Sequence, residues 1–196
     1  IFDEDIKQIL DACPDAYIFP RVNVSISREW ELRNPDELCD PYPDGTLSRT
    51  TFASDKWAEE VKRELGVFIA HVQESEYCSH IVGYQVAGGN TEEWLPFDSK
   101  KSTSGKRAEE KFAEYVQEKG INASESTFFR FYSELVADRI IEFSSLIKHL
   151  TDRRLVVGTF YGYTLSCPYR SYGHHALFKI LKSEDVDFIC SPVCYS

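Results

Sequence analysis

The sequence predicts an α/β fold in which short apolar strands alternate with amphipathic helices around a parallel sheet. Apolar residues at helical spacing recur between short runs rich in β-branched and aromatic residues, which is the pattern of consecutive βα units. The chain has 196 residues, of which 42% are hydrophobic and 28% are charged, a composition typical of a folded globular domain. We therefore expect a single domain that spans residues 1–196.

In the first half of the chain the pattern predicts a helix, a strand, a long loop, a second helix and a second strand. Ile6, Ile9 and Leu10 lie at helical spacing, and Pro14 ends that helix. The polar segment after the first strand is rich in proline and aspartate, which is typical of a loop, and Ser54 is a favourable N-cap for the next helix. The predicted ranges are 3–12, 17–24, 25–55, 54–72 and 81–86.

In the second half the pattern predicts a surface loop, two helices, a third strand, a further helix and a fourth strand. The longer helix has a buried stripe that includes Phe131, Leu135, Ile140 and Phe143. The third strand is the apolar run that begins at Leu155. The predicted ranges are 98–106, 107–119, 127–149, 155–163, 173–182 and 186–190.

The charge of the chain argues against two kinds of partner. The formal net charge is -10 and the sequence pI is about 5.0, and no stripe of lysine and arginine interrupts this acidic balance, so we do not expect nucleic acid. No apolar run approaches the roughly 20 residues of a membrane span, so we expect no membrane partner. Six cysteines without a framework spacing are expected to be reduced and mostly buried, which favours a cytoplasmic setting.

The histidines and cysteines do not form a metal-binding pattern. His174 and His175 are adjacent, and Cys78 precedes His80, but neither pair has the Cys-x-x-Cys or His-Glu-x-x-His spacing of zinc sites. We expect structural roles for them, with His174 near the start of the helix before the fourth strand. The sequence therefore predicts no metal and no cofactor.

Polar and aromatic residues follow each predicted strand. Strands separated by helices run parallel with right-handed crossovers, so their carboxyl ends face the same way. Ligands bind at that rim in barrels and open parallel sheets. The segments expected at the rim are 23–30, 88–94, 161–165 and 191–195.

The segment from Gly88 to Trp94 is the most informative of these. It leaves a strand through two glycines and then presents Asn90, Thr91, Glu92, Glu93 and an indole. A carbohydrate site combines such groups, because an acid protonates the glycosidic oxygen, polar groups hold hydroxyls, and an aromatic face covers a sugar ring. Two other interpretations are open: the glutamates begin a helix and Trp94 is a packing residue, or the glycines form a phosphate-binding loop.

Longer runs of sequence resemble the bacterial β-galactosidase-like glycoside hydrolases of clan A. The run from Ile81 to Trp94 resembles the acid/base segment on the fourth barrel strand of that family. Three other runs, 157–163, 173–177 and 185–195, resemble the fifth and sixth strands and the helix between them. The resemblance implies a fold of the (β/α)8 TIM-barrel type, present as a partial barrel that covers roughly strands three to six.

The resemblance also implies a retaining glycosidase. Glu93 is the expected acid/base because it directly precedes Trp94. In the family an asparagine usually stands immediately before the acid, whereas here Thr91 and Glu92 separate Asn90 from Glu93, so Glu92 is the alternative. The family's nucleophile is a glutamate on the seventh strand. It is expected to lie beyond Ser196, so we expect this chain to be inactive alone and to need the missing barrel strands or another copy of itself as partner.

Residues near the strand ends are candidates for binding a carbohydrate substrate. Alternation places Arg21 and Asn23 on the same face of the first strand, where they could hold hydroxyls or orient a carboxylate. For the aromatic candidates apart from Trp94, ordinary packing is an equal alternative. The candidates are Arg21, Asn23, Trp30, Asn90, Trp94, Tyr161, Tyr163 and Tyr195.

Two other functions are open from the residues. A noncatalytic carbohydrate-binding or scaffold domain would have the same side chains at the carboxyl ends of the strands but would not hydrolyse a glycoside. A nucleotide-binding domain would place an anion on the backbone amides of 88–91, although two carboxylates follow at once.

Overall fold

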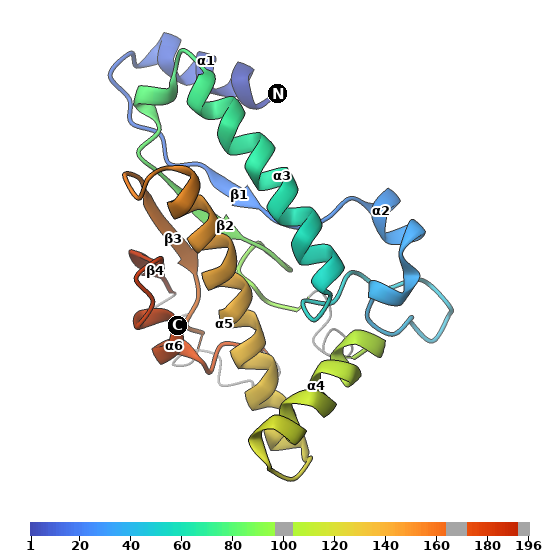
Figure 1. Ribbon diagram of the computed structural model, residues 1–196. Helices are drawn as coiled ribbons and strands as arrows, with labels where there is room; N and C mark the ends of the chain where they lie inside the picture. The colour runs from blue at the N-terminus through green and yellow to red at the C-terminus, as the bar shows by residue number, and fades with distance from the viewer. Residues whose placement is uncertain (97–103, 164–171, 192–196) are drawn as a thin grey trace, which may run out of the picture.

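The computed structural model describes residues 1–96, 104–163 and 172–191 (Figure 1). Within them, four parallel strands form one sheet in the order β1-β2-β3-β4, so that each strand lies beside the next one along the chain. This confirms the predicted α/β fold class, and consecutive order is how strands follow one another in a (β/α) barrel wall. The strands are β1 (Arg21–Asn23), β2 (Gly83–Ala87), β3 (Val156–Phe160) and β4 (Phe188–Cys190).

The helices confirm the predicted alternation. Ser54 accepts a hydrogen bond from the backbone N–H of Trp57 and so caps α3 as predicted. The two long helices α3 and α5 run along the sheet in Figure 1. The helices are α1 (Phe2–Ala12), α2 (Arg28–Arg33), α3 (Asp55–Glu74), α4 (Lys106–Lys119), α5 (Glu125–Leu150) and α6 (Leu177–Leu181), with short 3-10 turns η1 (Pro35–Glu37) and η2 (Cys78–His80).

Two expectations about these segments need correction. The segment 25–55 was expected to be a loop, but it contains α2 and η1, because Ser27 caps α2 and Pro35 begins η1. The helix expected at 173–182 is shorter and begins only at Leu177. Residues 98–103 of the expected surface loop lie outside the described residues.

The face of the sheet beneath the helices forms the core. Tyr84, Val86 and Val157 are fully buried on it, and the Tyr84 ring meets Phe68 of α3 edge-on at 6.2 Å. The register pairs Tyr84 with Val157, so buried side chains of neighbouring strands lie side by side. Burial of this row fixes which residues face the opposite side, because side chains alternate along a strand.

The opposite face carries both polar side chains and aromatic rings. The register places Arg21, Gln85, Gly158 and Phe188 in one row across the four strands. The Phe188 ring covers Gly158 so closely that a Cβ there would lie 2.3 Å from it. Phe19 contacts Phe188 with ring centroids 5.3 Å apart. Polar side chains from β1 and β2 and an aromatic ring from β4 therefore share one level of this face.

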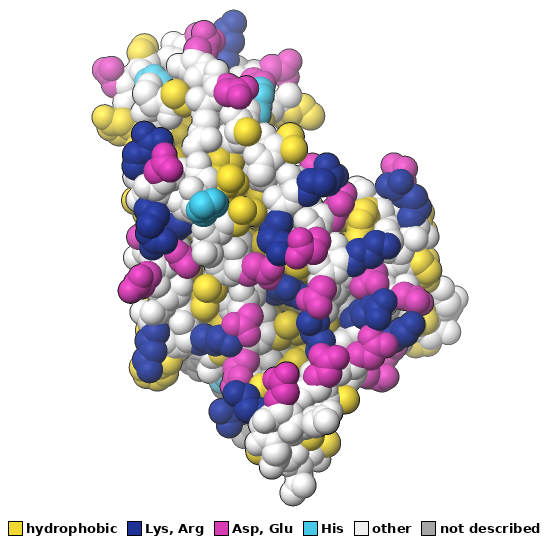
Figure 2. Space-filling view, in the orientation of Figure 1, with side chains coloured by type: hydrophobic (Ala, Val, Ile, Leu, Met, Phe, Trp, Pro, Cys, Tyr) yellow, Lys and Arg dark blue, Asp and Glu magenta, His cyan; other side chains and the backbone are white. Residues whose placement is uncertain are grey.

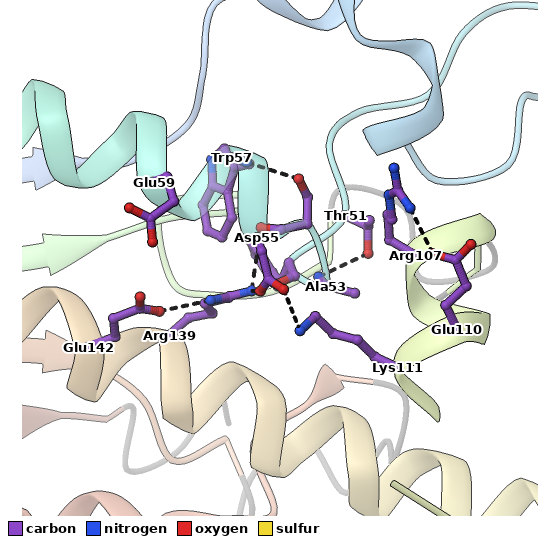
Figure 3. A network of polar contacts seen from close by, with 12 residues as sticks. Thr51, Ala53, Asp55, Trp57, Glu59, Arg107, Glu110, Lys111, Arg139 and Glu142 are labelled. Carbon is purple, nitrogen blue, oxygen red and sulfur yellow. Dashed lines mark hydrogen bonds and ion pairs between the residues drawn. The ribbon is translucent and has the colours of Figure 1, made fainter. Parts of the chain in front are cut away.

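Ion pairs tie α3, α4 and α5 together (Figure 3). Asp55 at the start of α3 binds Arg139 of α5 at 2.6 Å and Lys111 of α4 at 2.9 Å. Arg107 of α4 binds Glu37 of η1 at 2.9 Å. On the face shown in Figure 2, basic and acidic side chains are intermixed over these helices. No stripe of one sign is visible on this face of the described residues.

The cysteines were expected to be mostly buried, and two of those described are not. Cys13 and Cys78 are exposed, whereas Cys39 is buried and Cys190 is half-buried. Burial raises the pKa of the Cys39 thiol to about 12. Cys167 and Cys194 lie outside the described residues. Among the described helices, none is both long and apolar enough to cross a membrane.

Candidate active site

The turn that follows β2 has an unusual backbone. Thr91, Glu92 and Trp94 have φ values of 55°, 62° and 59°, a region that residues other than glycine rarely adopt, and Gly89 has φ 72°. The turn is closed by hydrogen bonds from Asn90 N–H to the Leu95 carbonyl at 2.8 Å and from Trp94 N–H to the Gly88 carbonyl at 2.7 Å. The two glutamates therefore stand in a strained turn, and the interpretation that they begin a helix is wrong.

The same hydrogen bonds argue against a phosphate-binding loop. The backbone N–H groups of Asn90, Glu92 and Trp94 donate to carbonyl groups within the turn and are not available to an anion.

Trp94 anchors this turn in the core. Its side chain is fully buried, its indole Nε1–H donates to the Val86 carbonyl at 3.1 Å, and its ring packs against Phe52 and Phe143 at 5.4 and 6.3 Å. Of the two roles open for Trp94, the structure shows packing and not a ring presented to a sugar, because the apolar ring is more favourably placed against other aromatic rings than in solvent. Its burial instead holds the preceding glutamates at the strand end.

Glu92 is directed towards β1. Its Oε1 accepts a hydrogen bond from Asn23 Nδ2 at 3.0 Å, and its Oε2 lies 3.6 Å from Nη1 of Arg21. Arg21 also donates from Nε to Gln85 Oε1 at 3.2 Å. Arg21 and Asn23 lie on one face of β1, as alternation predicts, and together they orient a carboxylate.

Glu93 is directed towards β3 and has partners of a different kind. Its Oε2 accepts hydrogen bonds from the Thr91 hydroxyl at 2.9 Å and from the Tyr163 hydroxyl. A hydroxyl can donate or accept, whereas guanidinium and amide N–H groups only donate. The surroundings of Glu93 therefore accommodate either a carboxylate or a protonated carboxyl group, but both oxygens of Glu92 already face donors.

The residues after β3 form a buried support for Tyr163. Tyr161 is fully buried, donates from its hydroxyl to the Gly173 carbonyl at 2.8 Å, and stacks on His174 with centroids 4.3 Å apart. Burial raises the pKa of Tyr161 and lowers that of His174 to about 4. Tyr161 is thus a packing residue, which was the alternative to substrate binding in the sequence analysis.

The remaining candidates are dispersed. Trp30 is only 7% exposed and belongs to the core, so packing is also its role here. Asn90 is exposed at the tip of the turn. Tyr195 lies outside the described residues. The structure thus brings together five of the predicted residues, on either side of the strained turn: Arg21, Asn23, Glu92, Glu93 and Tyr163.

Three groups at the site were not among the residues predicted to bind or catalyse. The Thr91 hydroxyl and Gln85 contact the candidate residues, and His174 supports Tyr163 from beneath. A hydroxyl two residues before Glu93 was visible in the sequence, but its direction depends on the positive φ angles. Among the described residues there is no group of three or more side chains that could hold a metal ion.

The fold and this rim define the class to which the chain belongs: a (β/α)-barrel type of protein with carboxylates at the strand ends. No family model matches the sequence, and no curated protein matches it significantly. Among solved structures, the chain is similar to a β-galactosidase from the Antarctic haloarchaeon Halorubrum lacusprofundi, with a TM-score of 0.57 and 15% identity over 96% of this chain and 32% of that one.

It is also similar to a β-galactosidase from the psychrophilic Marinomonas ef1, with a TM-score of 0.52 and 14% identity over 89% of this chain and 30% of that one. The chain thus spans about a third of the length of each. At this identity the likeness concerns the fold alone. It confirms a glycoside hydrolase-like fold of the TIM-barrel type, of which the described strands form a part.

Proposed function

We propose that this chain supplies the acid/base side of a retaining β-glycosidase site, with Glu93 as the acid/base. The observation that carries the proposal is the contrast between two neighbouring carboxylates. Glu93 faces two hydroxyl groups, whereas Glu92 faces Arg21 and Asn23. An acid/base must both release and accept a proton during one catalytic cycle, and hydroxyl partners suit both states.

In this proposal Glu93 protonates the glycosidic oxygen as the bond to the sugar breaks. It then takes a proton from the water that releases the sugar from the second carboxylate of a retaining pair, which stands about 5 to 5.5 Å away in such enzymes. Tyr163 holds the Glu93 carboxyl in place. Glu92 keeps Arg21 and Asn23 together at the end of β1, where their remaining donors can bind sugar hydroxyls.

The proposed substrate is a β-linked, galactose-like glycoside. The two similar structures are both β-galactosidases, which supports this class of substrate. A noncatalytic carbohydrate-binding domain is less well supported, because Trp30, Trp94 and Tyr161, which could have formed aromatic platforms, are buried.

The test compares Glu93→Gln with Glu92→Gln in the full-length protein, using aryl β-galactosides. Glu93→Gln should lower kcat/KM by about 10²- to 10⁴-fold for an aryl group that leaves poorly, and much less for an activated group such as dinitrophenolate, which needs no proton. Glu92→Gln should lower kcat/KM for both substrates to a similar degree.

Unchanged turnover by Glu93→Gln with the poor leaving group would remove Glu93 from this role. If Glu92→Gln alone showed the dependence on leaving group, the acid/base would be Glu92.

A further inference from the structure

His174 is a fully buried histidine that accepts two hydrogen bonds at one nitrogen. Its side chain belongs to a residue only 1% exposed. Nδ1 lies 3.2 Å from the backbone nitrogen of Gly162 and 3.3 Å from that of Tyr163, and both N–H groups point to it. Because Nδ1 accepts, it carries no proton, and the neutral ring has its proton on Nε2.

The imidazole is itself held firmly. It stacks on Tyr161 at an interplanar angle of 11°, and the Tyr161 hydroxyl donates to the carbonyl of Gly173, the residue before His174. The same hydroxyl accepts the N–H of Ala176 at 3.2 Å. Gly173 has φ 77°, and a Cβ there would lie 2.9 Å from Tyr132, so the chain passes His174 in a conformation suited to glycine. The acceptor nitrogen therefore has little freedom to move.

The two amides that His174 binds belong to the segment that carries the Tyr163 hydroxyl to Glu93. The peptide group between Gly162 and Tyr163 is held at both ends: its N–H donates to His174, and its carbonyl, from Gly162, accepts a hydrogen bond from the Ser191 hydroxyl at 2.9 Å. Gly162 has φ 108°, an angle that side chains rarely allow. The backbone before Tyr163 is thus fixed by hydrogen bonds rather than by regular secondary structure.

We infer that His174 is a positioning residue: its unprotonated Nδ1 fixes the backbone at Gly162 and Tyr163 and thereby holds the Tyr163 hydroxyl on the Glu93 carboxyl group. This inference deepens the proposed function and rests on it for the role of Glu93. The placement of Tyr163 by His174 is a statement about structure that can be measured without any substrate.

Protonation of His174 would break this arrangement. An imidazolium carries N–H at both nitrogens. A protonated Nδ1 would therefore face the two amide N–H groups from which the neutral Nδ1 accepts hydrogen bonds. Tyr161 and Tyr163, from the segment after β3, are the titratable side chains packed against the ring. From the turn after β2, Glu93 and Trp94 approach His174 through their backbones, and the charge of His175, the next residue in the chain, opposes protonation. Burial keeps the pKa of His174 at about 4, more than offsetting the backbone groups of Trp94 and Glu93 that favour protonation. The ring is therefore neutral above that pH.

The test uses two substitutions at His174 and one control. In His174→Asn the side-chain oxygen can take the place of Nδ1 and accept both N–H groups, but it does not titrate. His174→Leu removes the acceptor. The control is His175→Asn, since His175 is the exposed neighbour. All variants are made in the full-length protein.

The first measurement is amide hydrogen exchange of the backbone at Gly162 and Tyr163. Exchange should be at least about tenfold faster in His174→Leu than in the wild type, and close to wild type in His174→Asn and His175→Asn. In wild-type protein labelled with ¹⁵N-histidine, the His174 signal should be that of the Nε2–H tautomer at pH 7. Unchanged exchange in His174→Leu, or a protonated Nδ1, would overturn the inference.

The second measurement is glycoside hydrolysis as a function of pH. His174→Leu should lower kcat with little change in KM, and His174→Asn should restore most of kcat. The loss of activity that His174 protonation causes near pH 4 should move to lower pH in both His174 variants and stay in place in His175→Asn. If His174→Leu exchanged faster but kept the wild-type kcat, positioning of Tyr163 would have no part in the reaction, and the inference would fail. If exchange responded as expected but the wild type hydrolysed no glycoside, the proposed function would fail and the placement of Tyr163 by His174 would stand.

Discussion

Two segments leave the carboxyl ends of neighbouring strands and are held in place by different means. The segment 24–54 after β1 is long and is ordered by a buried charge, Glu31. The turn 88–95 after β2 is short and is ordered by hydrogen bonds within its own backbone and by the buried Trp94. A long segment can bring distant side chains to one carboxylate, whereas a short one must adopt strained backbone angles to direct its side chains. The candidate catalytic residues stand on the short, strained segment.

Glu31 shows how the long segment is ordered. Its carboxylate is fully buried and accepts from Arg49 at 2.8 Å, from Arg28 at 3.0 Å, and from the backbone N–H and hydroxyl of Thr50 at 2.9 and 3.0 Å. Arg28 in turn donates to the Ser48 carbonyl at 2.7 Å. One side chain thus connects α2 with the chain nearly twenty residues later, in a segment with little regular structure.

Replacing Glu31 should have the largest effect. Glu31→Ala leaves the Thr50 N–H buried without an acceptor and removes the partner of two arginines, and should lower the free energy of unfolding by about 3 kcal/mol. Glu31→Gln keeps an acceptor and should cost less. Urea unfolding at pH 7 measures both, and a loss below about 1 kcal/mol for Glu31→Ala would show that the segment is held by other contacts.

The stability that Glu31 contributes should depend on pH. Burial alone would raise the pKa of Glu31, but Arg49, Thr50 and Arg28 outweigh it and hold the pKa below its ordinary value. The contribution is therefore fully present above the ordinary carboxyl pKa of the unfolded chain, and is lost as the pH falls through the lower pKa of the folded chain. Glu31→Gln should flatten the acid side of the stability curve, and an unaltered curve would argue against the ion pairs.

Gly89 should be the position in the turn after β2 at which a substitution destabilises the protein most. A Cβ on Gly89 would lie 2.2 Å from the Leu95 carbonyl oxygen, and φ is +72°. Gly89→Ala should therefore cost at least about 2 kcal/mol, since both strain and a backbone clash oppose it. Gly120→Ala is the matched control, because Gly120 also has positive φ but nothing lies within 4 Å of an added Cβ, and about 1 kcal/mol is expected. Equal losses in the two variants would mean that the turn can open at little cost.

The sequence predicted the regular parts of this fold well and its special backbone poorly. Apolar periodicity located four strands, and the cap at Ser54 located the start of a helix. Both are local signals, because each depends only on residues a few positions apart in the sequence. The positive φ of Thr91, Glu92 and Trp94 has no local signal, since these residue types seldom adopt it and the tertiary structure imposes it. α2 was missed because its six residues are too few to show periodicity.

The candidate site divides in the same way. Arg21 and Asn23 were expected on one face of a strand. This can be predicted from the sequence alone, because side chains two residues apart in a strand point to the same face. The partners of the two glutamates could not be predicted, because the turn sends adjacent side chains to opposite neighbours, Glu92 to β1 and Glu93 to Tyr163. Trp94 was expected to face a sugar, but how deeply an indole is buried depends on packing that only the whole fold determines.

Relieving the strain of the turn should stabilise the protein slightly. Thr91 is β-branched and has φ 55°, so Thr91→Gly should raise the free energy of unfolding by up to about 1 kcal/mol. The same change removes the hydroxyl that donates to Glu93, so the proposed function predicts that glycoside hydrolysis falls even as stability rises. Thr91→Ser is the control that keeps the hydroxyl. Lower stability of Thr91→Gly would show that the turn is not strained at this position.

The smallest effect is expected for a surface ion pair that links the segment after β1 to α4. Lys106 of α4, which follows the β2 turn along the chain, lies 3.2 Å from Asp36 of η1, in the segment after β1, and both side chains are more than half exposed. Water and salt screen such a pair, and ordering two long side chains opposes it, so Lys106→Ala should change the free energy of unfolding by less than about 0.5 kcal/mol. Its neighbour Arg107 binds the buried Glu37, so Arg107→Ala should cost clearly more, and the difference between the two variants should persist at high salt. If both variants behaved alike, the segment after β1 would be joined to α4 by exposed charges only, and the buried charge of Glu37 would add nothing to the order of that segment.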